Sequence, residues 1–249
     1  MRTNSPVLYF RVPCGHHVQF NIKVMEDVDL VRSYTPVLST LFPDDKAQES
    51  VDGSLHFLIK TYENGAATQY LSKLEKGSSV LLSDDMGSFD SNWVKSNVQQ
   101  LLLVFAGTGF TPMIKLLKEF CEYDRGPKNN SNITVLAFNK TVKDIIWKEQ
   151  LDLLERKFGN SERLSVNIHH ILSQEGSENQ AKFHFGRISV ALLKNILPAN
   201  LQKRQDSNAA VGQIRLCCIC GPIPFNQEAR RIFQNEFNYD CEELYFFEG

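Results

Sequence analysis

The feature that most constrains the fold is an unbroken apolar run at residues 101–106, which ends in the turn Gly107-Thr108-Gly109. Such a run is typical of a strand in a parallel sheet, because helices cover that kind of sheet on both faces. Apolar residues at helical spacing follow over residues 112–123 and predict a helix directly after the turn. The second half of the chain is therefore expected to begin with a strand–turn–helix unit.

The rest of the second half alternates between strand and helix patterns. The predicted strands are at residues 133–138, 164–172 and 215–220. The predicted helices are at residues 145–158, 190–196 and 225–237. Alternating units of this kind predict a doubly wound parallel sheet.

The first half carries short apolar or alternating runs bounded by turn residues, at residues 7–12, 18–24, 55–62 and 78–83. Such runs predict an antiparallel barrel or sandwich, with one short helix at residues 68–74. A polar stretch at residues 91–99 separates the two patterns. The expected fold is thus β followed by α/β, with a barrel at residues 1–95 and a doubly wound domain at residues 96–249.

Composition excludes several classes of function. The formal net charge of −2 and the pI of about 6.3 give no reason to expect a nucleic-acid partner. The six cysteines form no zinc ligand set, so we expect no metal site, and reduced thiols indicate an intracellular compartment. No apolar run approaches the roughly 18–20 residues that span a bilayer, and the first residues lack a signal-peptide pattern. The sequence therefore predicts a cytoplasmic protein.

The motif Arg32-Ser33-Tyr34-Thr35-Pro36 suits an anionic, planar ligand such as a flavin nucleotide. Arginine pairs with phosphate, tyrosine packs on a flat ring, and threonine bonds ring heteroatoms. Pro36 favours an extended Thr35, which fixes the directions of these side chains. An ordinary strand end with a surface arginine explains the motif equally well.

Three segments have the small residues that let a backbone approach a nucleotide. Gly65-Ala66-Ala67-Thr68 precedes the first predicted helix, where backbone N–H groups could receive a pyrophosphate. Gly107-Thr108-Gly109 and Cys220-Gly221-Pro222 each end an apolar strand and precede a helix. Two such strand ends in one parallel sheet would face the same crevice. Simple turns and a buried inert cysteine remain the alternatives.

Asp144 follows another predicted strand. A carboxylate there could accept from ribose hydroxyls and repel a 2′-phosphate, which would favour NADH. Stabilisation of the helix that follows is an equal alternative. The pair His169-His170 has no ligand partners along the sequence and is interpreted as structural or as part of the surface.

Together these motifs resemble the NADH–cytochrome b5 reductase family of the ferredoxin–NADP reductase superfamily. The similarity covers residues 7–249 and includes Gly107-Thr108-Gly109-Phe110-Thr111-Pro112-Met113 and Cys220-Gly221-Pro222. The segments Phe138-Asn139-Lys140-Thr141 and Cys218-Ile219-Cys220 more closely resemble the reductase module of soluble animal proteins that fuse cytochrome b5, a CS domain and b5 reductase.

The resemblance implies an FAD site in the first domain. In it Arg32 would neutralise phosphate, Ser33 would lie in the same binding strand, Tyr34 would pack on the flavin, and Thr35 would bond the ring. Lys60 would contact FAD. The pyrophosphate would be held by the backbone of Gly65, Ala66, Ala67 and Thr68.

The resemblance also implies an NADH site in the second domain. Gly107, Thr108 and Gly109 would admit the nucleotide, and Asp144 would set the preference for NADH. Cys220, Gly221 and Pro222 would line the nicotinamide pocket. The residues expected at the reacting rings are Thr35, Thr111 and Cys220.

The chain departs from the family pattern at three points. Ala66 and Ala67 stand where simple b5 reductases carry lysine and methionine, and Ala106 replaces the first glycine of Gly-Gly-Thr-Gly. The family also has about two barrel strands before the point where this sequence begins, which could weaken FAD retention by leaving a sheet edge unpaired.

The resemblance implies an enzyme in which a hydride passes from NADH to FAD, and single electrons then pass to a haem protein such as cytochrome b5. One alternative is a truncated reductase-like domain with impaired FAD binding. Another is an NADPH-dependent flavin reductase for a different acceptor. The expected location is the cytoplasm, with association to the endoplasmic reticulum left open.

Overall fold

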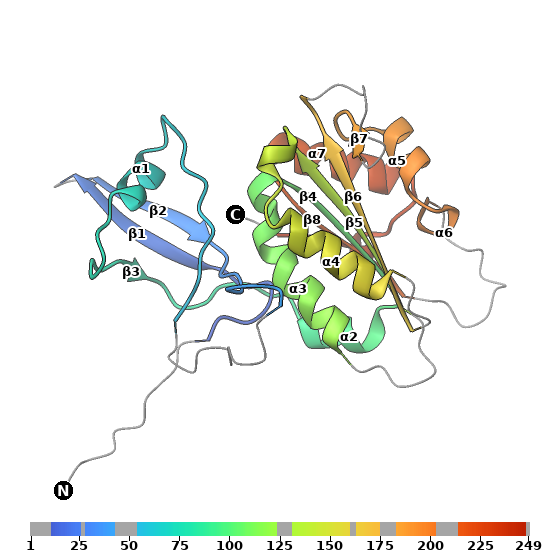
Figure 1. The fold of residues 1–249 in the computed structure, drawn as a ribbon, viewed down its shortest axis with the longest axis horizontal. Helices are drawn as coiled ribbons and strands as arrows, with labels where there is room; N and C mark the ends of the chain where they lie inside the picture. Colours follow the sequence, from blue (N-terminus) through green and yellow to red (C-terminus); the bar gives the residue numbers. More distant parts are fainter. Residues whose placement is uncertain are drawn as a thin grey trace, which may run out of the picture. The chain divides into compact units, whose positions relative to one another are not determined.

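A computed structural model describes residues 11–25, 28–42, 54–123, 131–159, 163–174, 183–202 and 214–247 (Figure 1). The chain divides into two compact units, residues 1–89 and residues 90–248. The boundary predicted at residue 95 falls inside helix α2, Ser91–Asn97, which belongs to the second unit. This polar stretch is helical because the Asp90 carboxylate accepts from the backbone N–H groups of Asn92 and Trp93, at 3.0 and 2.9 Å.

The first unit contains an antiparallel sheet in the order β2-β1-β3. The strands are β1 (Val18–Met25), β2 (Val28–Tyr34) and β3 (Leu81–Leu82), and the helix is α1 (Ala66–Ser72). Alternate residues of β1 point inward, so Val18, Phe20 and Ile22 are buried together with Ala67 of α1. The sheet therefore has one apolar face, which packs against α1.

Two strand predictions in the first unit are corrected. Residues 55–62 form no strand in the structure, and the strand expected at 78–83 is limited to β3. Leu55, Phe57 and Ile59 still pack on the core, yet the backbone there makes an isolated bridge from His56 to Val37. Alternation of apolar residues reports burial on one side and does not require strand pairing. Most of the run at 7–12 lies outside the described residues.

The second unit contains a six-stranded sheet in the order β7-β6-β5-β4-β8-β9, with every neighbouring pair parallel. Its strands are β4 (Gln100–Ala106), β5 (Ser131–Asn139), β6 (Leu164–Leu172), β7 (Phe183–Phe185), β8 (Arg215–Cys220) and β9 (Leu244–Phe246). The strand order reverses direction at β4, which lies between β5 and β8. The predicted doubly wound sheet is confirmed.

Helices cover both faces of this sheet (Figure 1). They are α3 (Phe110–Glu122), α4 (Lys148–Phe158), α5 (Val190–Ile196), α6 (Ala199–Gln202) and α7 (Ile223–Asn235). Short 3-10 helices are η1 (Gly107–Gly109), η2 (Val142–Asp144) and η3 (Cys241–Glu243). Side chains of α5, α6 and α7 share one core with Val104, Leu136 and Ile219 of the sheet.

Helix α4 begins three residues later than predicted. Trp147 has a left-handed backbone with φ of 54°, which separates η2 from α4. A left-handed residue of this size is uncommon and needs support from its neighbours. Trp147 has that support, because its ring packs edge-to-face on Phe110 at 5.6 Å between centroids.

Candidate nucleotide site at the switch point

The turns after β4 and β8 lie side by side at the carboxyl edge of the sheet. Phe105 is the register partner of Cys220, so the strands end together. A Cβ added to Gly109 would lie 2.1 Å from the carbonyl oxygen of Cys220, which means that the two backbones are in direct contact. The prediction that both glycine turns share one edge is confirmed. This edge, where the strand order reverses, is where open α/β sheets bind nucleotides.

Gly107 gives this edge an open backbone. Its φ is +55°, and a Cβ added there would meet no heavy atom within 4 Å. Glycine is favoured for conformation at this position, since a left-handed turn strains larger residues. The space beside the Gly107 α-carbon is thus open.

Thr111 and Thr108 rigidify the start of α3. The Thr111 hydroxyl is nearly buried and donates to the Thr108 carbonyl oxygen at 3.1 Å. Thr111 therefore stabilises the loop that follows β4. Its predicted place at the flavin–nicotinamide contact stays a prediction.

Cys220 is buried at the end of β8, and burial raises the pKa of its thiol to about 12. A thiol with this pKa stays protonated at neutral pH, so it can contact a ligand and cannot act as a thiolate nucleophile. Gly221 is confined beside it, because an added Cβ would meet the Phe225 ring at 2.6 Å and Ala106 at 3.2 Å. Pro222 is exposed and precedes α7.

The Asp144 carboxylate closes a local capping arrangement. Its Oδ2 atom accepts from the Thr141 N–H at 3.1 Å and from the Thr141 hydroxyl at 2.8 Å. Thr141 reciprocates by accepting from the backbone at Asp144. Asp144 thus caps the 3-10 helix η2, and the helix expected at residue 145 begins at Lys148. The role of Asp144 in nucleotide preference stays a prediction.

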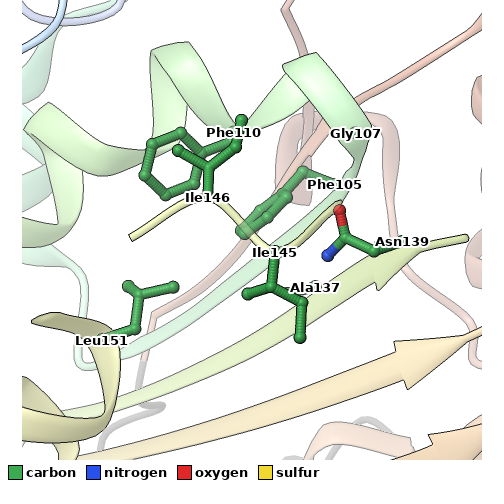
Figure 2. A pocket seen from close by; sticks show the side chains of 8 residues that line it. All are labelled: Phe105, Gly107, Phe110, Ala137, Asn139, Ile145, Ile146 and Leu151. Atoms are coloured by element: carbon green, nitrogen blue, oxygen red, sulfur yellow. The ribbon is translucent and has the colours of Figure 1, made fainter. Parts of the chain in front are cut away.

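A shallow pocket lies between β4, β5 and α4 (Figure 2). Figure 2 shows the amide of Asn139 as the polar side chain among apolar ones. The lining residues are Phe105, Gly107, Phe110, Ala137, Asn139, Ile145, Ile146 and Leu151. Sequence reasoning did not single out Asn139. Its place directly after the apolar run of β5 was the available signal, since such strand ends face the crevice.

In the first unit, Arg32 and Tyr34 leave β2 from the same sheet face. Their register partners are the inward-facing Phe20 and Val18, whereas Ser33 pairs with Gln19 on the other face. Burial raises the pKa of the Tyr34 phenol, and the nearby Arg32 cation opposes that rise. The structure thus brings the cation and the aromatic ring together and separates Ser33 from them. Thr35 follows the strand and is half-buried.

The remaining predicted FAD residues lie around α1. Gly65 precedes the helix, which has no side-chain N-cap, and Ala66 and Ala67 form its first turn. The Thr68 hydroxyl donates to the Gly65 carbonyl oxygen at 3.1 Å and accepts from the Tyr62 N–H at 3.2 Å. Lys60 is exposed and precedes this segment. These contacts keep the segment compact, and its predicted pyrophosphate contact stays a prediction.

Comparison with known families agrees with this geometry. The family described as "Oxidoreductase FAD-binding domain" matches residues 1–90, and "Oxidoreductase NAD-binding domain" matches residues 103–231. A fold with an antiparallel front sheet and a nucleotide site at the switch point of a parallel sheet defines a nucleotide-dependent redox protein. The chain belongs to the oxidoreductase family that joins these FAD-binding and NAD-binding domains.

Several curated relatives are named cytochrome b5 reductases. "Cytochrome b5 reductase 4" of Homo sapiens is 34% identical over 97% of this chain and 42% of its own length. "NADH-cytochrome b5 reductase 2" of Kluyveromyces lactis is 25% identical over 79% of this chain and 56% of its own length. The chain spans less than half the length of the human relative.

Solved structures give the same picture. The CS and b5R domains of human Ncb5or, solved in the NAD+ form, align with a TM-score of 0.75 and 32% identity over 96% of this chain and 61% of that one. The cytochrome b5 reductase domain of Ulva prolifera nitrate reductase aligns with a TM-score of 0.70 over 95% of this chain and 85% of that one. At 19% identity, the second likeness concerns the fold. The resemblance inferred from the motifs is confirmed.

Proposed function

We propose that this chain is an NADH-dependent cytochrome b5 reductase, which uses FAD to pass electrons from NADH to a haem protein. The observation that carries the proposal is the direct backbone contact between Gly109 and Cys220 at the switch point of the NAD-binding domain. It brings together the two strand-end turns that a nicotinamide nucleotide would meet, on a chain that also has an FAD-binding domain.

The first unit fits an FAD molecule chemically. Arg32 and Tyr34 share a sheet face, so a phosphate and a flat ring of one ligand could meet both. The Arg32 guanidinium donates to the Val31 carbonyl oxygen at 2.7 Å, which leaves further N–H donors of its fork for an anion. In the proposed site Arg32 binds phosphate, and Tyr34 with Thr35 orients the ring.

Bound FAD supplies the conversion between a two-electron donor such as NADH and a one-electron acceptor such as haem. The protein's part is to hold the nucleotides in place. The Gly107 backbone admits the NADH phosphates, while Cys220 and Gly221 shape the nicotinamide side of the crevice. A protonated Cys220 fits this positioning role, because the reaction needs no thiolate.

The choice between NADH and NADPH is assigned to Asp144. The Thr141 contacts fix one carboxylate oxygen in place, which supports a fixed negative charge near the nucleotide. A fixed charge would repel a 2′-phosphate. We accordingly propose NADH as the donor.

The described part of the chain has no helix long and apolar enough to cross a membrane. We propose a cytoplasmic location from the sequence patterns alone, and any association with the endoplasmic reticulum is likewise a proposal.

The test uses the purified full chain incubated with FAD and then freed of excess cofactor. We expect flavin absorbance, reduction of ferricyanide by NADH, and reduction of cytochrome b5 at a comparable rate per flavin. NADPH should give a kcat/KM at least tenfold lower than NADH.

Each of the other outcomes would contradict one part of the proposal. Failure to retain FAD would contradict the reductase function itself. Ferricyanide reduction without cytochrome b5 reduction would contradict the acceptor, and equal rates with NADPH would contradict the role of Asp144.

A further inference from the structure

One tryptophan, Trp147, has a backbone conformation that its side chain does not favour. Its φ of 54° and ψ of 37° are left-handed, and it is the N-cap residue of α4. Across the residues that the structure describes, Trp147 and Asn238 are the two residues other than glycine with a positive φ. Asparagine tolerates this region through local hydrogen bonds of its side chain, whereas tryptophan needs tertiary contacts to hold it there. The contacts of the Trp147 ring therefore decide this conformation.

The Trp147 ring packs against the glycine turn through Phe110. The two rings meet edge-to-face, with centroids 5.6 Å apart and an angle of 88° between their planes. Phe110 packs in the same way on Phe105, with centroids 5.8 Å apart. Phe105 precedes the turn Gly107–Gly109 and Phe110 follows it, and both rings are buried. The three rings thus hold both ends of the glycine turn beside the start of α4.

The segment before Trp147 leads back to the Asp144 turn. Ile145 and Ile146 alone separate the two residues along the chain, and both line the pocket that Phe110 also lines (Figure 2). Because this connection is short, a Trp147 ring held against Phe110 also limits where the Asp144 turn can lie. Trp147 therefore connects the two turns to which the proposed function assigns the binding of NADH.

We propose that Trp147 is a positioning residue, which holds the glycine turn and the Asp144 turn at the spacing that a bound nicotinamide nucleotide needs. The inference rests on the proposed function, since it requires NADH to meet both turns. Without the ring the two turns can separate, and only the fraction of molecules with the correct spacing binds the nucleotide, which lowers the apparent affinity. The bound state is the same once formed, so the loss should fall on KM and not on kcat.

The test separates the Trp147 ring from its backbone conformation, with ferricyanide as the acceptor for the FAD-loaded full chain. Trp147→Gly removes the ring and keeps a residue that accepts the left-handed backbone. We expect it to raise the KM for NADH at least fivefold, with kcat within twofold of the parent value. Trp147→Phe retains an aromatic edge for Phe110 and should recover most of that loss. The matched control is Trp93→Gly, the same substitution at an exposed tryptophan of α2, which should change the KM by less than twofold.

Tryptophan fluorescence gives a second readout that does not require Trp147→Gly to fold. The chain has two tryptophans, so Trp93→Phe leaves Trp147 as the sole reporter. Titration of this FAD-loaded variant with NAD+ should change the Trp147 emission saturably, with a midpoint at the dissociation constant that isothermal titration measures for the same variant. A ring that only stabilises the start of α4 would show no change.

The outcomes distinguish this inference from the proposed function. If the parent chain binds no NAD+, the proposed function is contradicted and the inference with it. The inference alone is overturned if the parent chain binds NAD+ while Trp147→Gly keeps the parent KM, or if the Trp147 emission is unchanged at saturating NAD+. An equal rise of the KM in Trp93→Gly would overturn it as well, because the effect would then not belong to the Trp147 contact.

Discussion

At the residue scale, the candidate site depends on two glycines, which have no side chain. Gly109 lies so close to the Cys220 carbonyl that any Cβ would force the two turns apart. Gly107 needs its left-handed backbone and has open space beside it. The two glycines of one motif are thus required for different physical reasons.

Gly109→Ala should raise the KM for NADH at least tenfold and lower the melting temperature by several degrees. The added Cβ meets backbone atoms at 2.1 and 2.6 Å, and backbone cannot move aside as a flexible side chain can. Gly77→Ala is the matched control, because Gly77 also has a positive φ, its added Cβ meets nothing within 4 Å, and it lies outside the candidate NADH site, so only the strain of about 1 kcal/mol remains. Steady-state kinetics and thermal unfolding would check this. Equal effects of the two variants would contradict the steric argument.

Arg32→Ala should weaken FAD binding about tenfold or more, since hydrogen bonds to charged groups contribute about 1.5–3 kcal/mol. The flavin-to-protein absorbance ratio during dilution measures the affinity. Lys23→Ala is the control, because Lys23 is an exposed cation of the adjacent strand whose register partner is Asp29, three residues before Arg32. If both variants retain FAD equally, Arg32 does not bind the phosphate.

The sequence motifs identified most residues at the switch point but not their contacts. The motifs were recognisable because they lie at the ends of apolar strands: Gly107 and Gly109 follow β4, and Cys220 ends β8. Asn139 was missed because one polar residue after a strand carries no distinctive pattern. The reciprocal bonds between Thr141 and Asp144 depend on a 3-10 turn that spacing alone does not predict.

At the element scale, the last strand of the sheet is fixed by one buried ion pair. Arg215 of β8 donates to both Glu243 carboxylate oxygens at 2.9 Å and to the Asn238 carbonyl oxygen at 2.8 Å. Its guanidinium also lies 3.9 Å from the centre of the Tyr239 ring. These contacts connect β8 to the segment that leads into β9.

Arg215→Met should lower the free energy of unfolding by about 3 kcal/mol, because it leaves Glu243 beside the core without its partner. Urea unfolding followed by circular dichroism would measure the loss. Arg231→Ala breaks an exposed pair with Glu228 and should produce no measurable change. Replacing Glu243 with glutamine as well should recover part of the loss, and a full additive loss would contradict the pairing.

The stability of the β6–β7 edge should depend on pH. Because the pKa of His169 falls from 6.5 to about 4 on folding, the unfolded chain binds more protons between these values. The free energy of unfolding should therefore decrease as the pH is lowered from about 6.5 to about 4. Burial also lowers the pKa of His184 and of His170, so both histidines contribute to the same dependence.

Unfolding of the protein at several pH values would measure this dependence. His169→Asn should flatten the pH dependence. Parallel curves for His169→Asn and the parent chain would contradict the assignment.

Elements whose sequence carries a continuous apolar pattern were predicted well. Elements that depend on backbone pairing or on a capping residue were not. The strand at 164–172 and the helix at 190–196 match β6 and α5 residue for residue. The strand predicted at 55–62 was wrong, because its alternating apolar residues pack on the core while its backbone forms an isolated bridge instead of a strand. Helix α2 was missed because its start depends on a cap from Asp90 and not on apolar spacing.

At the scale of the whole molecule, the two units are separate compact bodies with separate cores. The change in hydrophobic pattern made the two-part organisation predictable, since strands of a half-buried sheet and strands of a fully buried sheet differ in composition. The family assignment depended on motifs from both units together.

FAD and NAD+ should protect different parts of the chain from hydrogen exchange. FAD should slow exchange at residues 28–36, and NAD+ should slow it at Gly107–Gly109 and residues 220–223, because a ligand suppresses local opening where it binds. Mass spectrometry of peptides would measure both, with the buried strand β5 as the internal control. Protection by FAD confined to the second unit would contradict the division of roles.

The buried thiols of β8 have a consequence for chemical damage. Burial raises the pKa of Cys220 to about 12 and that of Cys217 well above its usual value, so almost no thiolate forms near the crevice. Peroxide and alkylating reagents attack thiolates, and the exposed Cys241 is the thiol they would reach first. The end of β8 at the candidate site is therefore expected to stay chemically intact while Cys241 is oxidised.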